Sequence, residues 1–277
     1  MPLLQSLSSG VSAMQQFQQE LDVIGNNIAN VATTGYKGAD VEFADALSQT
    51  MQGAGATGAM QVGTGVTTGS IANRFTQGAI NATNRPTDLA ISGNGFFVVR
   101  DPVTNAQFVT RNGNFTVDTS GYLVLGDMRV QGYSDPSLTT INDIKIDPTG
   151  APGGVTGAIQ SWNFDSKGNI RVTLNDANST VFTRGQVLLQ NFQSPQMLVK
   201  DGNNLYSGMS GAGPLAQASA PGTSGLGNLE IGALEGSNVD LTTELSNLIT
   251  TQRAFEANSK VITTSDEVLQ TLVNLKR

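Results

Sequence analysis

The chain has 277 residues and a formal net charge of −7, and only 13% of its residues are charged. Soluble domains average about 25% charged residues, so this surface is polar but weakly charged, and its acidic balance argues against a nucleic-acid-binding protein. Because the sequence has no Cys and no His, it lacks disulfides, thiolate metal ligands and the commonest general base, and we predict no catalytic residue, no metal and no cofactor.

Residues 3 to about 32 form the first predicted element, a helix with apolar side chains mostly three, four or seven residues apart. This spacing places the side chains on one seam. The seam consists of Leu4, Leu7, Val11, Met14, Leu21, Ile24, Ile28 and Val31. Because Gly10 and Gly25 each weaken the helix by up to ~1 kcal/mol, we expect it to be ordered only when this seam is covered by a partner.

The same segment does not resemble a secretory signal peptide, because no Lys or Arg precedes Lys37 and polar residues interrupt every apolar run. No stretch of the chain reaches the ~18 apolar residues that a membrane-spanning helix needs. We therefore predict no membrane insertion, and either a cytosolic protein or one exported without a cleaved signal.

Residues 52–65 and 208–227 are rich in Gly, Ala, Ser and Thr and are typical of flexible connectors. Between about residues 60 and 232, turn-forming residues recur every eight to twelve positions between short apolar runs. This spacing indicates an all-β domain.

Several strands and turns of that domain can be predicted individually. Phe96–Val99 followed by Asp101-Pro102 indicates a strand and a turn. Phe108–Thr110 and Phe115–Val117 flank Asn112-Gly113, a pair that favours positive φ in tight turns, and together they predict a hairpin. Further turns are expected at Asp118–Gly121 and Ser166–Asn169.

The last predicted element is a second helix that starts near Asp240. Its apolar side chains are again at helical spacing, and they are Leu241, Leu245, Leu248, Phe255, Ile262, Leu269 and Leu272. Ser237 or Asp240 can supply the N-cap. Glu244 suits the first turn, and Lys276 and Arg277 suit the negative end of the helix dipole.

These elements predict an α+β fold, in which long terminal helices pair as a coiled-coil-like core and a central all-β domain is inserted between them. The expected bounds are 1–35 with 238–277 for the helical core, 36–82 for an extended connector, 83–207 for the β domain and 208–237 for the return connector. A small insertion is expected within residues 134–158.

Three blocks of sequence resemble the flagellar rod and hook axial proteins. LDVIGNNIANVATTGYKGADVEF (residues 21–43) resembles the N-terminal signature of that family. LAISGNGFFVV with FVTRNGNFTVDTSGYLV (residues 89–99 and 108–124) is similar to its β-domain motif, and residues 234–275 resemble its C-terminal helix. The blocks occur in the family's order.

The resemblance implies a structural subunit that passes unfolded through the flagellar export apparatus and assembles into a helical tube in the hook or basal body. Its implied partners are copies of itself and neighbouring axial proteins of the rod, the hook cap and the hook–filament junction. The C-terminal sequence is closer to that of hook proteins, whereas the short, compact chain resembles a rod protein. We therefore expect a hook subunit, with a distal-rod subunit as the alternative.

Subunit contacts are expected along both helices. The predicted interaction residues are Leu4, Leu7, Val11, Met14, Leu21, Ile24, Asn26, Asn27, Ile28, Asn30, Leu245, Leu248, Phe255, Ile262, Leu269 and Leu272. The three asparagines could form a polar ladder between subunits, because an amide both donates and accepts. Equally, this region could simply end the helix, with Gly35 as a left-handed cap.

Other features have simpler interpretations. Gly93–Gly95 lacks the Gly-Lys-Ser/Thr and the helix of a phosphate loop and indicates a turn. The only Trp, Trp162, is expected in the core or between strands. Aspartates without EF-hand spacing indicate turns rather than a metal site, and these are Asp143, Asp147, Asp165 and Asp176.

Two alternatives from other classes remain. A secreted β-rich adhesin with a coiled-coil stalk fits the high content of Gly, Asn and Thr, but such a protein should carry a signal peptide or a membrane anchor. A carboxylate-dependent enzyme on a β scaffold would need two acidic residues in one pocket, which sequence spacing cannot show.

Overall fold

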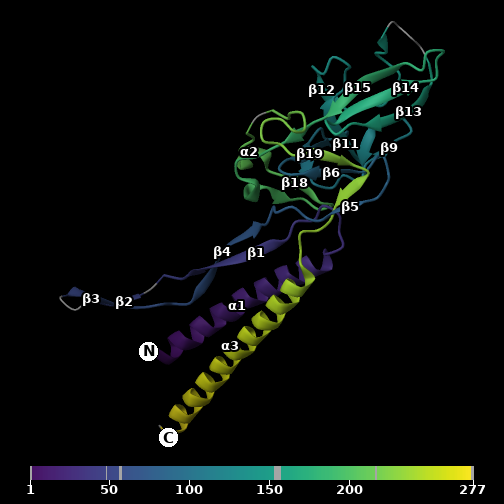
Figure 1. Cartoon of the computed structure of the whole chain (residues 1–277). Helices are drawn as coiled ribbons and strands as arrows, with labels where there is room; N and C mark the ends of the chain where they lie inside the picture. Colours follow the sequence, from purple (N-terminus) through teal and green to yellow (C-terminus); the bar gives the residue numbers. More distant parts are fainter. Residues whose placement is uncertain (1, 48, 56–57, 153–156, 216, 276–277) are drawn as a thin grey trace. The chain divides into compact units, whose positions relative to one another are not determined.

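The computed structural model describes residues 2–47, 49–55, 58–152, 157–215 and 217–275. The chain forms two compact units, one from residues 1–31, 38–74 and 239–277 and the other from residues 32–37 and 75–238. The predicted α+β class is confirmed, because a helix stands at each end of the sequence and strands fill the middle (Figure 1).

The first unit, here called the helical unit, contains α1 (Pro2–Ala29), β1 (Ala39–Asp45), β2 (Gln49–Gly55), β3 (Gly58–Val62), β4 (Val66–Asn73) and α3 (Leu241–Leu275). The second, the β unit, contains β5 (Ile80–Ala82), β6 (Leu89–Ser92), β7 (Phe96–Arg100), β8 (Gln107–Thr110), β9 (Thr116–Val117), β10 (Leu123–Leu125), β11 (Met128–Tyr133), β12 (Ile141–Asp143), β13 (Ile159–Phe164), β14 (Asn169–Leu174), β15 (Val181–Val187), β16 (Leu189–Gln190), η2 (Pro195–Met197), β17 (Val199–Lys200), β18 (Leu205–Ser207), α2 (Met209–Ala212), β19 (Asn228–Ile231) and β20 (Ala233–Glu235).

In the helical unit α1 and α3 pack against each other, and Figure 1 shows them side by side. α3 begins where the sequence predicts. The carboxylate of Asp240 caps it by accepting hydrogen bonds from the backbone N–H groups of Thr242 at 2.8 Å and Thr243 at 3.1 Å. Among the described helices, none is both long and apolar enough to cross a bilayer.

The expected connector at 36–82 contains regular strands. β1 pairs antiparallel with β4, and β2 with β3, so most of the stretch expected to be flexible at 52–65 is β-structure, with residues 56–57 outside the described range. The ring of Phe43 meets that of Phe17 edge-on at 6.1 Å, and the N–H of Val66 donates to Oγ of Ser12 at 3.3 Å. α1 therefore packs against β1 and β4 of this expected connector.

The β unit is organised around a sheet in the order β13-β14-β15-β11-β7-β8-β18-β17. Successive residues of β7 enter different cores: Phe97 lies in the larger core and Phe96 in a smaller one with Tyr206. This explains the unbroken apolar run of β7, because both faces of the strand are covered. Trp162 packs against the larger core and meets Phe164 edge-on at 5.5 Å, as predicted.

The predicted Asn112-Gly113 hairpin is wrong. β8 pairs with β7 and β18, whereas β9 pairs with β10. A Cβ built on Gly113 would lie only 1.7 Å from the carbonyl oxygen of Leu89, so glycine is needed here for close backbone approach and not for a tight turn. The actual hairpin joins β7 to β8 through the turn at Asp101. The turns predicted at 118–121 and 166–169 are present.

The remaining expected segments are only partly irregular. Within residues 134–158, β12 pairs with β11, and residues 153–156 lie outside the described range. The return connector at 208–237 contains α2, β19 and β20; β19 pairs with β6, and β20 with β5.

Candidate assembly surface

The seam that joins α3 to α1 is polar. Glu244, Thr251, Asn258 and Ser265 recur every seven residues along α3, and all except Asn258 are buried. Glu244 accepts a hydrogen bond from Asn27 of α1 at 3.4 Å. The buried residues of α3 are therefore all polar, and coiled-coil-like pairing of α1 with α3 is not confirmed.

Glu20 of α1 lies beside this polar seam. Burial raises the pKa of the Glu20 carboxyl, and a hydrogen bond from Thr251 offsets part of that shift. Because Glu20 meets Thr251 and Asn27 meets Glu244, residue numbers fall along one helix as they rise along the other. The two helices are therefore antiparallel within the chain.

The three predicted asparagines have different environments. Asn27 is 1% exposed, and its amide brackets Ala39: Nδ2 donates to the carbonyl at 2.9 Å, and Oδ1 accepts from the N–H at 3.1 Å. This occupies Asn27 within its own chain and leaves it unsuited to a ladder between subunits. Asn30 donates to the carbonyl of Asn26 one turn earlier at 2.9 Å, and Asn26 is exposed.

The predicted apolar residues flank the polar seam. Ile24 is buried, and the side chain of Leu4 lies outside what the structure describes. The half-buried members are Leu7, Met14, Leu21, Ile28, Leu248, Phe255, Ile262 and Leu269, and the exposed members are Val11, Leu245 and Leu272. The apolar spacing thus identified residues on the two helices that, except for Ile24 and the undescribed Leu4, keep exposed surface for another partner.

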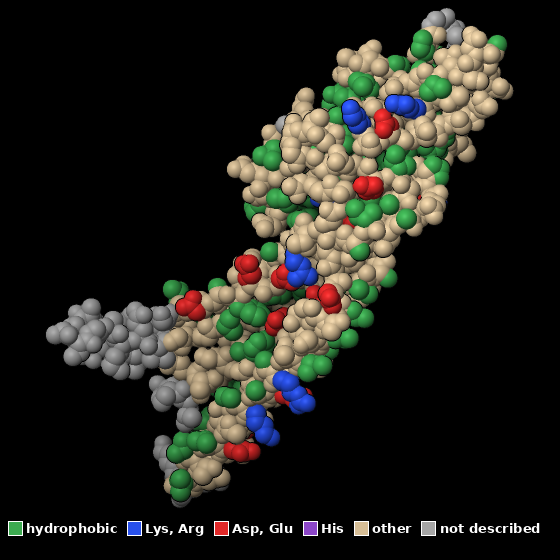
Figure 2. Space-filling view, in the orientation of Figure 1, with side chains coloured by type: hydrophobic (Ala, Val, Ile, Leu, Met, Phe, Trp, Pro, Cys, Tyr) green, Lys and Arg blue, Asp and Glu red, His purple; other side chains and the backbone are tan. Residues whose placement is uncertain are grey.

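α3 also presents apolar residues that are absent from the predicted set of interaction residues. They are 44% to 78% exposed, and they are Leu241, Ile249, Val261, Val268, Val273 and Leu275. In Figure 2, green apolar side chains lie along the helices, interspersed with charged ones. Large exposed apolar patches commonly mark interaction surfaces. Val261, Val268 and Leu275 recur every seven residues, and this spacing is a signal that could have identified these three from sequence.

A buried ion cluster lies within the β unit. The side chains of Glu235 and Lys37 are fully buried, and Lys37 Nζ lies 2.6 Å from Glu235 Oε1. Nη1 of Arg111 lies 3.2 Å from the other carboxylate oxygen. Burial lowers the pKa of Lys37, and the nearby Glu235 charge opposes that shift. The paired cations therefore compensate for the burial of the Glu235 carboxylate.

Gly35 belongs to this cluster rather than to the end of α1. Its φ of +68° is left-handed, but its N–H donates to the carbonyl of Glu235 at 2.8 Å, and α1 has already ended at Ala29. The interpretation of Gly35 as a helix cap is therefore wrong.

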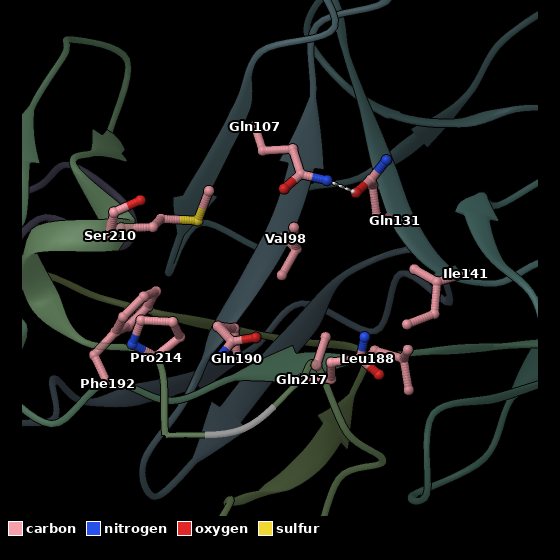
Figure 3. Close-up of a pocket in the computed structure, with 12 residues that line it drawn as sticks. Val98, Gln107, Gln131, Ile141, Leu188, Gln190, Phe192, Ser210, Pro214 and Gln217 are labelled. Atoms are coloured by element: carbon pink, nitrogen blue, oxygen red, sulfur yellow. Dashed lines mark hydrogen bonds between the residues drawn. The ribbon is translucent and has the colours of Figure 1, made fainter.

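A groove of about 560 Å³ opens on the β unit (Figure 3). Its lining combines amide side chains with apolar ones, including Gln107, Gln131, Gln190 and Gln217 with Val98, Leu188 and Phe192. Nε2 of Gln107 donates to Oε1 of Gln131 at 2.8 Å. None of the described residues that line this groove is acidic or basic, so it gives no support to the carboxylate-enzyme alternative.

The aspartates considered above serve ion pairs and turns. Asp143 pairs with Arg100 at 2.6 Å and with Arg129 at 3.3 Å. Asp176 accepts hydrogen bonds from the N–H and hydroxyl of Thr180 at 2.7 and 2.6 Å. Asp147 pairs with Arg184 and Asp165 with Arg171. Among the described residues, no group of three acidic side chains could hold a metal ion.

Three segments of the chain match families of flagellar proteins. Residues 7–37 match the flagella basal body rod protein family, and residues 90–189 match the D1 domain of the flagellar hook protein FlgE/F/G. Residues 231–275 match the C-terminal region of the flagellar basal body rod FlgEFG protein. The matches cover α1, much of the β unit and α3.

Similarity to individual relatives extends from end to end. The flagellar basal-body rod protein FlgG of Bacillus subtilis (strain 168) is 43% identical over 282 residues, covering 99% of this chain and 100% of the relative. FlgG of Caulobacter vibrioides is 36% identical over 284 residues with the same coverage. The flagellar hook protein FlgE of Borreliella burgdorferi is 27% identical over 444 residues, again covering 99% and 100%. The chain belongs to the flagellar rod and hook axial proteins, a family of structural proteins and not of enzymes.

Proposed function

We propose that this chain is a subunit of the flagellar distal rod and that its copies polymerise into a helical tube through their terminal helices. The observation that carries the rod assignment is the 43% identity, over matched lengths, to a protein named flagellar basal-body rod protein FlgG. The hook relative is only 27% identical, over an alignment of 444 positions that far exceeds this chain of 277. The rod alternative therefore has better support than the hook assignment, which the C-terminal sequence favoured.

The proposed subunit contacts are the apolar residues beside the polar seam, together with exposed apolar residues elsewhere on α3. Leu248, Phe255 and Ile262 remain half-buried, while Ile249 and Val268 are 57% and 46% exposed. Covering such side chains with a neighbouring copy stabilises the assembly by about 25 cal/mol per Å² of apolar surface. In the proposed assembly two different patches meet, and such a contact repeated from copy to copy forms an open helical assembly.

The low charge of the surface limits repulsion between stacked copies, since only 13% of the residues are charged. The rod assignment implies a location in the basal body and contacts with adjoining axial proteins, including those of the hook. It also implies passage through the flagellar export apparatus without a cleaved signal peptide.

Deletion of the gene, followed by electron microscopy of isolated basal bodies, tests the assignment. We expect a truncated rod, restored to full length when the wild-type gene is supplied on a plasmid. A complete rod that lacks only the hook would identify a hook subunit and overturn the rod proposal. Intact, full-length flagella would contradict both assignments.

A further inference from the structure

Two segments from opposite ends of the sequence meet within the β unit. Residues 33–37 follow α1, and residues 235–238 precede α3. The N–H of Gly35 donates to the carbonyl of Glu235 at 2.8 Å, and the N–H of Asn238 donates to the carbonyl of Tyr36 at 3.4 Å. Each segment therefore supplies an acceptor for a backbone donor of the other.

The Glu235 side chain links the same two segments to the rest of the β unit. One carboxylate oxygen accepts from Lys37 Nζ at 2.6 Å and from the N–H of Gly78 at 2.9 Å. The other accepts from Arg111 at 3.2 Å. Lys37 also donates to the carbonyl of Thr76 at 2.8 Å. The carboxylate thus joins residues from three separated parts of the sequence.

Burial of these charges makes the arrangement interdependent. A buried charge is strongly unfavourable unless it is paired and hydrogen-bonded, and removal of one partner from a buried pair leaves the other uncompensated. Lys37 lies on the N-terminal segment and Glu235 on the C-terminal one. If either segment left its place, the fully buried charge on the other would lose this partner.

We propose that the Glu235 cluster makes residues 33–37 and 235–238 a single cooperative unit, so that the two segments dock on the β unit together and leave it together. Lys200 reinforces the N-terminal segment: its Nζ donates to the carbonyl of Lys37 at 2.7 Å and lies 4.5 Å from the ring centroid of Tyr36. Molecules in which only one of these two segments is docked on the β unit are then rare.

Native-state hydrogen exchange on the unmodified full chain tests the proposal directly. Amides that open in one cooperative unit share the same opening free energy and the same dependence on denaturant. The N–H of Gly236 donates to the carbonyl of Ala79, outside both segments, at 2.8 Å, so it stays protected if residues 33–37 leave alone. At increasing urea concentrations below the unfolding transition, we expect Gly35 and Gly236 to exchange with matching slopes and to converge on one opening free energy. Openings with different slopes for the two amides would overturn the proposal.

Two substitutions provide an independent test. Lys37→Met and Glu235→Gln should each accelerate exchange at both Gly35 and Gly236, by about tenfold or more. Acceleration confined to the segment that carries the substitution would contradict the coupling.

The matched control is Arg171→Met, because Arg171 forms a more exposed pair with Asp165 at 3.4 Å, with side chains 56% and 32% exposed. It should leave both amides unchanged. Fluorescence of Trp162 verifies that each variant retains a folded β unit. If a variant does not fold, the urea experiment on the unmodified chain still decides the proposal.

Discussion

Gly10 of α1 lies against Ile262 of α3, so closely that a Cβ built on Gly10 would be 3.2 Å from Cγ1 of Ile262. A larger side chain at residue 10 must therefore push the helices apart or displace Ile262. We predict that Gly10→Leu destabilises the helical unit by about 1–3 kcal/mol, the usual cost of overpacking. Thermal unfolding followed by far-ultraviolet circular dichroism measures the effect.

The same helix offers a matched control at Gly25, where a built Cβ meets nothing within 4 Å. Gly25→Leu should be neutral or stabilising by up to ~1 kcal/mol, because leucine favours a helix more than glycine does. If both leucine variants melt at the same temperature, close approach at Gly10 is not important for stability.

The exposed apolar residues of α3 permit a test of polymerisation that leaves the helix pair intact. We predict that Ile249→Asp and Val268→Asp abolish tube formation, because each places a charge on the proposed subunit contact. Surface substitutions usually change the free energy of unfolding by no more than about 0.5 kcal/mol, so monomer stability should be retained. Sedimentation and electron microscopy measure assembly.

Thr263→Asp is the control for these variants, because Thr263 is an exposed polar residue of the same helix. It should still assemble. If Ile249→Asp and Val268→Asp form tubes at wild-type yield, the proposal that this surface of α3 contacts a neighbouring subunit is wrong.

The ion pairs of Asp143 connect three strands of the β unit. Asp143 is on β12, and its partners Arg100 and Arg129 are on β7 and β11. We predict that Asp143→Asn destabilises the β unit by about 2 kcal/mol, less than for a fully buried pair because both arginines can still reach water. Urea unfolding monitored by Trp162 fluorescence measures the loss. Arg171→Met should change stability by less than about 1 kcal/mol, and an equal effect of the two variants would contradict this prediction.

Two exposed turns predict that the stability of the fold depends on pH. Hydrogen bonds from the N–H of Thr140 and the hydroxyl of Thr139 hold the pKa of Asp135 below its usual range. The hydroxyl and N–H of Thr180 do the same for the pKa of Asp176. A folded-state pKa below the unfolded value of about 3.9 stabilises the fold above that pH, and the stabilisation is lost as pH falls through the folded-state pKa.

The double variant Asp135→Asn/Asp176→Asn should therefore melt below the wild type near neutral pH, because it cannot gain that stabilisation. The difference in melting temperature should shrink as pH falls below about 4. A difference that stays constant across this range would show that the two carboxylates do not act through ionisation.

The terminal helices were predictable because their signals are local. The apolar spacing and the Asp240 cap identify α1 and α3 close to their observed bounds. The polar seam was not predictable in the same way. Glu244 and Thr251 have the composition of a solvated helix face, and their burial is explained by long-range contacts: Thr251 with Glu20 of α1, and Glu244 with Asn27 of α1 and with Arg74.

Long-range contacts also explain the other departures from the sequence predictions. Asn112-Gly113 has the local preference of a tight turn, but the backbone of Leu89 approaches Gly113 and determines its role. Lys37 and Glu235 are 198 residues apart, so no local pattern could connect them. The sequence-based resemblance identified the family, whereas end-to-end similarity to named rod proteins supports the choice of rod over hook.

The burial of Lys37 also affects how the folded chain can be cut. Trypsin cleaves after Lys or Arg, and the first such residue in this chain is Lys37, with the next at Arg74. Lys37 has no exposed side-chain surface, so cleavage after it requires the segment to open first. When opening and closing are fast, cleavage reports the population of the open form. Release of an intact fragment of residues 1–37 by brief trypsin treatment would therefore measure how often this segment opens, without any label or substitution.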